Sequence, residues 1–136
     1  MPVKSVDVRK LGMESEGGGQ RLLNGPHFQM WFNSYPPGRK GRMHCHNCDE
    51  TLYVIEGELT VTRPDGERDV LAPGMAIMIT GGQFYTLENS APGKTVFLGH
   101  NPRPTETMRT VEYEPRQEHD PREGHSSPPR FTTLLS

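Results

Sequence analysis

The stretch that decides the fold is Gly38-Arg-Lys-Gly-Arg-Met-His44-Cys-His46-Asn-Cys-Asp-Glu50-Thr-Leu-Tyr-Val-Ile-Glu-Gly57. Successive side chains alternate faces in a β-strand, so the imidazoles of His44 and His46 point to the same side and can share one ion. Glu50 follows a polar interval and can return to that ion where the chain bends into the next strand. The stretch therefore predicts a two-histidine, one-carboxylate metal site with open positions for water or substrate.

Length and composition restrict the classes of protein that the chain can belong to. Its 136 residues suit one domain. Hydrophobic residues make up only 32% of the chain, but they concentrate between residues 28 and 98. A net charge of −2 with no basic stripe gives no reason to expect a nucleic acid or an anionic membrane as a partner. The chain shows no apolar leader and no run near the ~20 apolar residues of a spanning helix, so we expect a cytoplasmic protein.

The rest of the central region consists of short β-prone runs separated by turns. The Asp65-Gly66 pair is a strong hairpin signal, because it supplies the positive φ angles that such turns need. Short strands at intervals of roughly 8–12 residues, without helical periodicity, predict an all-β sandwich or barrel with almost no helix. The expected strands cover residues 21–35, 51–55, 59–62, 67–71, 75–80, 83–88 and 95–98.

The ends of the chain differ from this central region. Residues 1–25 are expected to form an N-terminal arm or edge strand, with one short strand through Val3, Val6 and Val8. The barrel is expected to span residues 26–113, with a docking strand near its end. Residues 114–136 are rich in proline and charge, so they cannot bury enough apolar surface to offset their ordering entropy. We expect this tail to be extended or flexible.

The central spacing also resembles a known sequence motif. Gly38 is followed after five residues by His44-x-His46, after three more by Glu50, and after six more by Gly57. This pattern resembles the first motif of the cupin superfamily position for position. The resemblance implies a double-stranded β-helix, which is a small jelly-roll barrel, with a metal ion inside. It also implies pairing into a homodimer, for which the outward Tyr53 is a plausible contact residue.

A second cupin motif would follow after a hairpin, and here it is incomplete. The matching residues are Gly74 and, after five residues, Thr80-x-Gly82, then Tyr85 and Asn89. Thr80 stands where the family usually has proline, and Tyr85 stands where it usually has its third histidine ligand. Asn89 is expected to bond to main-chain groups at a turn.

The chemistry of the site leaves several roles open. Two imidazoles and one carboxylate suit one divalent ion of iron, manganese, nickel, cobalt or zinc, and the sequence does not choose among them. Tyr85 could bind the ion as a phenolate, hold a metal-bound water, donate a proton, or simply line the barrel. Strand alternation would place Arg42 on the same face as His44 and His46, where it could pair with a substrate carboxylate or enolate; the alternative is a solvated charge.

Three functions are compatible with these residues. The first is a metal-dependent enzyme that uses Lewis-acid chemistry on a small anionic acid, enol or carbonyl compound, by decarboxylation, isomerisation, dehydration or cyclisation. The second is an Fe(II)-dependent dioxygenase, which would use the open metal positions for substrate and O₂. The third is a non-catalytic module that binds or senses a small ligand, since one fold serves many functions.

Overall fold

A computed structural model gives the structure of residues 3–102 and 108–114, which form short antiparallel strands and a short helix. The elements in chain order are α1 (Val8–Glu14), β1 (Gly18–Asn24), β2 (Phe28–Tyr35), β3 (His44–His46), β4 (Glu50–Glu56), β5 (Leu59–Thr62), β6 (Arg68–Leu71), β7 (Ala76–Ile79), β8 (Thr86–Asn89), β9 (Thr95–Pro102) and β10 (Thr110–Glu112).

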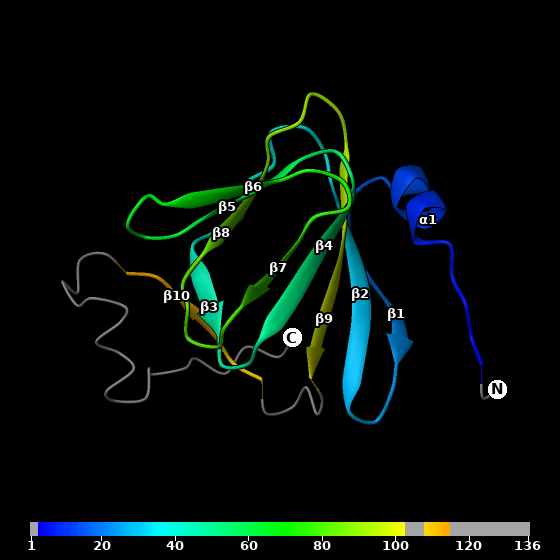
Figure 1. The fold of residues 1–136 in the computed structure, drawn as a ribbon, viewed down its shortest axis with the longest axis horizontal. Helices are drawn as coiled ribbons and strands as arrows, with labels where there is room; N and C mark the ends of the chain where they lie inside the picture. Colours follow the sequence, from blue (N-terminus) through cyan, green and yellow to red (C-terminus); the bar gives the residue numbers. More distant parts are fainter. Residues whose placement is uncertain (1–2, 103–107, 115–136) are drawn as a thin grey trace.

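The strands form two facing layers (Figure 1). One layer is a five-stranded sheet in the order β1-β2-β9-β4-β7. The other contains β6-β5-β8 and the pair β10-β3. His44 and Tyr85 join these two parts: each backbone N–H donates to the other's carbonyl, at 3.0 and 2.8 Å. This bridge places the first histidine of the central motif directly opposite the tyrosine of the second.

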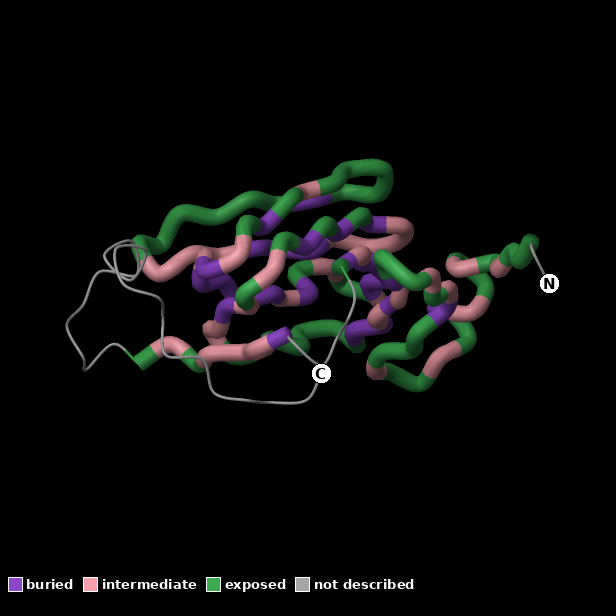
Figure 2. Tube along the Cα trace, turned by 90° about the horizontal axis from the view of Figure 1, so that it is seen from below, coloured by how far each residue is buried: buried purple, intermediate pink, exposed green. Residues whose placement is uncertain are grey.

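The hydrophobic core lies between the layers (Figure 2). In β4 buried and exposed residues alternate, so Leu52 and Val54 are fully buried while Tyr53 faces outward. Phe97 of β9 is also fully buried, and its ring meets that of Tyr35 edge to face at 5.1 Å. The all-β barrel and the alternation predicted for this region are confirmed.

Two glycines allow neighbouring segments of the five-stranded sheet to approach closely. Gly57, which ends the central motif, has a φ of 85°, and a Cβ there would lie 2.3 Å from Thr95 Oγ1. A Cβ at Gly99 would lie 2.2 Å from the ring of Trp31, which pairs with it across β2 and β9. Glycine at residue 99 therefore leaves room for the indole inside the barrel.

The N-terminal segment differs from the prediction. The strand expected through Val3, Val6 and Val8 is wrong: residues 3–7 have no regular structure, and α1 follows. Asp7 caps this helix by accepting a hydrogen bond from Lys10 N at 3.0 Å. A short helix of this kind depends on tertiary contacts, and Ser34 Oγ supplies one by donating to Gly12 O at 3.0 Å. Within the N-terminal region, β1 forms an edge of the five-stranded sheet.

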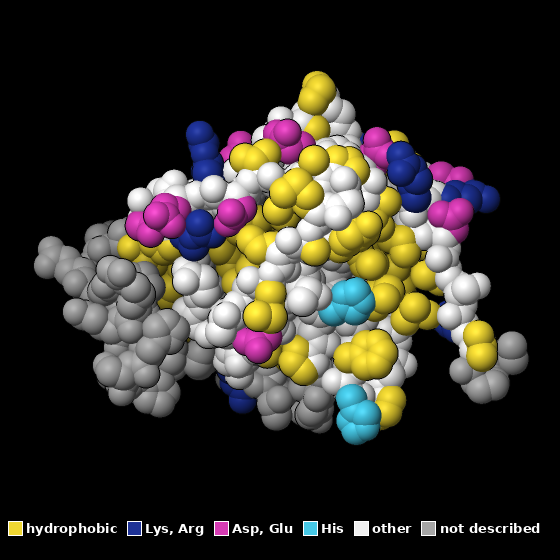
Figure 3. Space-filling view, in the orientation of Figure 1, with side chains coloured by type: hydrophobic (Ala, Val, Ile, Leu, Met, Phe, Trp, Pro, Cys, Tyr) yellow, Lys and Arg dark blue, Asp and Glu magenta, His cyan; other side chains and the backbone are white. Residues whose placement is uncertain are grey.

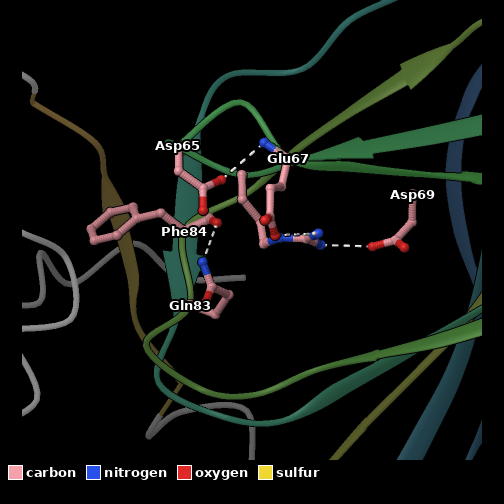
Figure 4. Close-up of polar contacts among 6 residues, drawn as sticks. Asp65, Glu67, Asp69, Gln83 and Phe84 are labelled. Atoms are coloured by element: carbon pink, nitrogen blue, oxygen red, sulfur yellow. Dashed lines mark hydrogen bonds and ion pairs between the residues drawn. The ribbon is translucent and has the colours of Figure 1, made fainter.

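The hairpin between β5 and β6 forms where Asp65-Gly66 predicted it. Asp65 Oδ1 accepts from Glu67 N at 2.9 Å, and Arg63 makes an ion pair with Asp69 at 2.7 Å (Figure 4). Asp65 and Asp69 lie on the surface, whereas Arg63 is 26% exposed and lines a second, smaller cavity. The hydrogen bond and the ion pair stabilise the turn.

The C-terminal part of the described chain returns to the barrel. β10 pairs with β3, with Thr110 opposite His46 and Glu112 opposite His44, so the predicted docking strand is confirmed. The proline-rich tail predicted over residues 114–136 lies outside the described residues, apart from Glu114. Among the described residues, no helix has the length and apolar character needed to cross a membrane.

The outer face of the five-stranded sheet carries exposed hydrophobic side chains. Figure 3 shows hydrophobic groups on the face that overlies β4, β9 and β2 in Figure 1, with two histidines on the side of β9 and β2. Large exposed residues of this sheet include Phe28, Tyr53 and Met78. Tyr53 faces outward, as strand alternation predicted, and its contact with a second copy of the chain stays a prediction.

Candidate metal centre and cavity

A cavity of about 360 Å³ opens between the two layers, and the central motif forms part of its wall. This volume falls in the lower part of the range of small-molecule sites. Aromatic and aliphatic side chains form much of the wall, with a few polar groups among them. The lining residues include His44, His46, Glu50, Tyr85, Arg21, Gln29, Trp31, Tyr35, Leu87, Asn101 and Met108.

The two histidines present their rings at one side of this cavity. The ring centroids of His44 and His46 lie 4.8 Å apart. His44 Nδ1 lies 2.8 Å from the carbonyl oxygen of Arg42, which can only accept, so Nδ1 carries the proton and Nε2 carries the lone pair. His46 Nδ1 lies 2.9 Å from Thr110 Oγ1 of β10. Burial and the neighbouring His44 lower the pKa of His46 to about 4, so this ring is neutral at pH 7, as a metal ligand must be.

Glu50 and Tyr85 form a buried pair beside the histidines. Tyr85 Oη donates to Glu50 Oε1 at 2.8 Å, and both side chains are buried. Burial raises the pKa of Glu50 to about 7, and the hydrogen bond from Tyr85 partly opposes that rise. Burial and the nearby Glu50 raise the pKa of Tyr85 well above its ordinary value. Tyr85 is therefore a neutral phenol that donates to Glu50.

His44, His46 and Glu50 are the residue types that the predicted metal site requires, and they line the same cavity. Within residues 3–102 and 108–114, no three His, Cys, Asp or Glu side chains already converge as a ligand set. His44 and His46 provide two imidazoles whose Nδ1 atoms are held by the scaffold, the arrangement typical of metal-binding histidines. Glu50 provides a desolvated carboxylate whose burial a cation would offset. The chemistry of the donor set suits one divalent ion, which the two histidines and Glu50 would hold with Tyr85 beside them.

Arg42 does not lie where the sequence predicted. The expected alternation fails because β3 begins only at His44, and the Arg42 side chain is 83% exposed. Its guanidinium pairs with Glu112 of β10 at 2.6 Å, and it is not among the residues that line the cavity. Arg21 of β1 lines the cavity instead. The arginine on the cavity wall therefore comes from the edge strand β1 rather than from the central motif.

The comparison with protein families identifies this architecture. The model of the cupin domain matches residues 31–99, which is half of the chain and contains both motifs. This chain belongs to the cupin family. Comparison with curated proteins finds no match to this cupin in sequence.

Solved structures show the same fold at low sequence identity. A conserved protein with a double-stranded β-helix domain from Klebsiella pneumoniae is 21% identical, with a TM-score of 0.67, over 82% of this cupin and 99% of that chain. The polyketide cyclase RemF from Streptomyces resistomycificus is 20% identical, with a TM-score of 0.66, over 93% and 94%. KdgF from Halomonas sp. is 23% identical, with a TM-score of 0.56, over 63% and 78%. These similarities establish the double-stranded β-helix fold.

The cavity of this cupin also contains polar residues that the sequence analysis missed. Asn101 of β9 donates from Nδ2 to Glu50 Oε2 at 3.4 Å, and its Oδ1 accepts from Trp31 Nε1 at 2.8 Å and from Gln29 Nε2 at 3.2 Å. The signal lay in strand alternation. Gln29 and Trp31 are two residues apart in β2, so they face the same side, and Gln29 pairs with Asn101 across the sheet.

Asn89, in contrast, has the structural role that was expected of it. Its Nδ2 donates to the carbonyl oxygens of Tyr35 and Gly93, both at 2.9 Å, and its Oδ1 accepts from Ala91 N at 2.8 Å. The end of the second motif therefore fixes a turn and takes no part in the cavity wall.

Proposed function

We propose that this cupin is a metal-dependent enzyme that acts on a small, anionic, oxygen-rich organic compound by decarboxylation, isomerisation, dehydration or cyclisation. The observation that carries the proposal is the placement of His44, His46, Glu50 and Tyr85 together on the wall of a largely apolar cavity. Such a cavity suits a small molecule that turns its polar group toward a few fixed donors and acceptors.

The protein groups divide into holding and proton-handling roles. His44, His46 and Glu50 would hold the ion. A bound divalent ion would act as a Lewis acid that stabilises negative charge developing on a substrate oxygen. Tyr85 carries its proton on Oη, 2.8 Å from Glu50, so it can donate that proton to a substrate atom that gains negative charge and take up a proton again from the substrate or from water. The raised pKa values of both groups keep this proton on the protein at neutral pH.

The charge that we expect of the substrate follows from the ionisable residues of the cavity. Glu50 is buried inside, and Arg21 contributes to the wall from the exposed edge strand. A substrate carboxylate near Arg21 would be attracted there and repelled from Glu50. This polarity would orient an anionic substrate with its reacting oxygen toward the histidines.

The neighbouring structures support the enzyme class. RemF is a polyketide cyclase, and its structural similarity extends over 93% of this cupin. Cyclisation of an enolisable carbonyl compound is one of the reactions that Lewis-acid chemistry and a tyrosine proton donor would catalyse together.

The test is turnover of a panel of small enolisable keto acids and phenolic acids, followed by mass spectrometry, with dissolved oxygen recorded in the same vessel. We expect conversion without oxygen uptake. His46→Ala should abolish turnover, while the matched variant His100→Ala should retain it, because His100 bonds to Thr51 and does not line the cavity. Oxygen consumed in step with product would replace the proposal with a dioxygenase. Ligand binding without conversion of any compound would favour the binding module.

A further inference from the structure

Gln29 is a buried residue of the cavity wall whose amide oxygen has no hydrogen-bond partner within the part of the chain that the structure describes. Gln29 is 3% exposed and lines the cavity. Among the described residues, its Oε1 is the buried side-chain oxygen or nitrogen that makes no hydrogen bond. A buried acceptor without a donor costs about 1–3 kcal/mol, so proteins keep one mainly where another molecule supplies the donor.

The orientation of this amide is fixed by its neighbours. The indole N–H of Trp31 can only donate, so the atom of Asn101 that lies 2.8 Å from it must be the oxygen. Asn101 then directs its NH₂ group toward Glu50. The same Asn101 oxygen lies 3.2 Å from one terminal atom of the Gln29 amide, so that atom must be the nitrogen of the NH₂ group. Turning the Gln29 amide over would bring two acceptors together, so Oε1 is the free atom.

We propose that Gln29 Oε1 is the acceptor of a substrate hydroxyl or N–H group, and that the substrate is a hydroxylated ring compound of the phenol or enol class. This inference rests on the proposed function for the choice of cavity and goes beyond it in naming a recognition group. A water molecule is the competing donor, and it would confer no preference for hydroxylated ligands.

The side chains of the cavity wall favour a substrate that contains a ring over one with an open carbon chain. Trp31, Tyr35 and Tyr85 line the cavity, and Trp31 is held in place by its hydrogen bond to Asn101 and by its close approach to Gly99. Fixed aromatic faces favour a flat partner that stacks or meets them edge to face. The volume of about 360 Å³ is at the small end of the range for ligand sites, which favours a compact substrate.

The subsite also explains why glutamine stands on this strand. Gln29 is linked through Asn101 to Glu50, so a donor bound at Gln29 is connected to the proposed catalytic groups by two hydrogen bonds. A hydroxyl held there would set the distance between the substrate ring and the histidines. Gln29 is thus a specificity-determining residue, and it need not touch the reacting atoms.

The experiment is isothermal titration of the purified full-length chain with 3-hydroxybenzoate and 3-fluorobenzoate. Both probes carry a ring and a carboxylate, but only the first has a hydroxyl donor. We expect 3-hydroxybenzoate to bind about 2- to 10-fold more tightly, the range for one neutral hydrogen bond. Gln29→Met should remove this preference and leave the affinity for 3-fluorobenzoate within about twofold. Gln83→Met is the matched control, because Gln83 lines a different cavity and should leave the preference intact.

Equal affinities in the wild type, a preference that survives in Gln29→Met, or no binding of either probe would each overturn the proposal. Should Gln29→Met not fold, ¹³C-glutamine labelling of the wild type gives the answer: the Gln29 side-chain carbonyl should shift with 3-hydroxybenzoate and stay unmoved with 3-fluorobenzoate. An unmoved signal with both probes would refute the subsite. Repeating the titrations with EDTA, and measuring metal in the same samples, separates the two proposals. A hydroxyl preference in a protein that never binds metal would retain the subsite and reject the enzyme.

Discussion

Removal of the Tyr85 hydroxyl is the perturbation whose effect follows most directly from the structure. Tyr85→Phe keeps the ring in the barrel and deletes the donor that Glu50 Oε1 accepts at 2.8 Å. Both side chains are at least 95% buried, so solvent does not replace the lost bond. At pH 8, above the pKa of about 7 that burial gives Glu50, the acceptor is mostly charged. A hydrogen bond to a charged group contributes about 1.5–3 kcal/mol, and we expect the free energy of unfolding at that pH to fall by that amount.

This energy converts into a measurable shift in melting temperature. An unfolding entropy of about 2.1 cal/mol/K per residue gives about 0.29 kcal/mol/K for 136 residues. The metal-free Tyr85→Phe protein should therefore melt about 5–10 °C below the wild type by differential scanning calorimetry. Tyr53→Phe is the matched control, since that ring faces outward and is 42% exposed, and its unfolding free energy should change by less than about 0.5 kcal/mol.

The same variant separates the roles open to Tyr85. If the phenol only donates a proton, Tyr85→Phe should retain the bound metal through His44, His46 and Glu50 while turnover falls about 10²-fold or more. Loss of the metal would instead make Tyr85 a ligand. A Tyr85→Phe protein as stable as Tyr53→Phe at pH 8 would refute the reasoning, because the hydrogen bond from Tyr85 to the charged Glu50 would then contribute nothing to stability.

Three further predictions concern the scaffold and the surface. Gly57→Ala should lower the free energy of unfolding by more than about 2 kcal/mol in urea titrations, because Gly57 has a positive φ and lies close to the β9 segment. Gly66 also has a positive φ but lies in open space, so Gly66→Ala should lower the free energy of unfolding by only about 1–2 kcal/mol. Equal losses in the two variants would contradict this explanation. Arg42→Ala should change the unfolding free energy by less than about 1 kcal/mol and leave the affinity for 3-hydroxybenzoate unchanged in titrations. Arg21→Ala should weaken that affinity about 5-fold or more. A larger loss of affinity in Arg42→Ala than in Arg21→Ala would restore Arg42 to the site. Light scattering after size exclusion should give twice the 15.3 kDa chain mass for the wild type and a lower mass for Tyr53→Glu. A monomeric wild type would contradict the homodimer expected from the sequence.

The parts of the fold that the sequence predicted are those governed by local periodicity and turn chemistry. Alternation in β4 places Leu52 and Val54 inside because a two-residue period leaves only two faces. The Asp65-Gly66 turn follows from backbone preference alone. Helix α1 was missed because its short sequence contains Gly12 and has no strong apolar period. The Asp7 cap was its one local signal, and its remaining support comes from contacts with distant strands.

The residues of the candidate site also fall into those that local sequence patterns predicted and those that they could not predict. His44, His46 and Glu50 are close in sequence, so their spacing was enough to bring them to one cavity wall. Arg42 was misplaced because the strand begins two residues after it, and strand ends are the least certain part of any pattern. Gln29 and Asn101 are 72 residues apart, and only the β2–β9 register brings them together. No local pattern could have shown that Asn101 joins Gln29 to Glu50.

The central claim is that His44, His46 and Glu50 bind one divalent metal ion, and elemental analysis of the purified protein tests it most directly. The measurement is inductively coupled plasma mass spectrometry of the wild type, His46→Ala and His100→Ala, each prepared in parallel. We predict about one equivalent of one divalent metal per chain in the wild type and in His100→Ala, and loss of that metal in His46→Ala. A wild type that still holds no metal after reconstitution with iron, manganese, nickel, cobalt or zinc would contradict the claim, and so would equal metal in all three proteins.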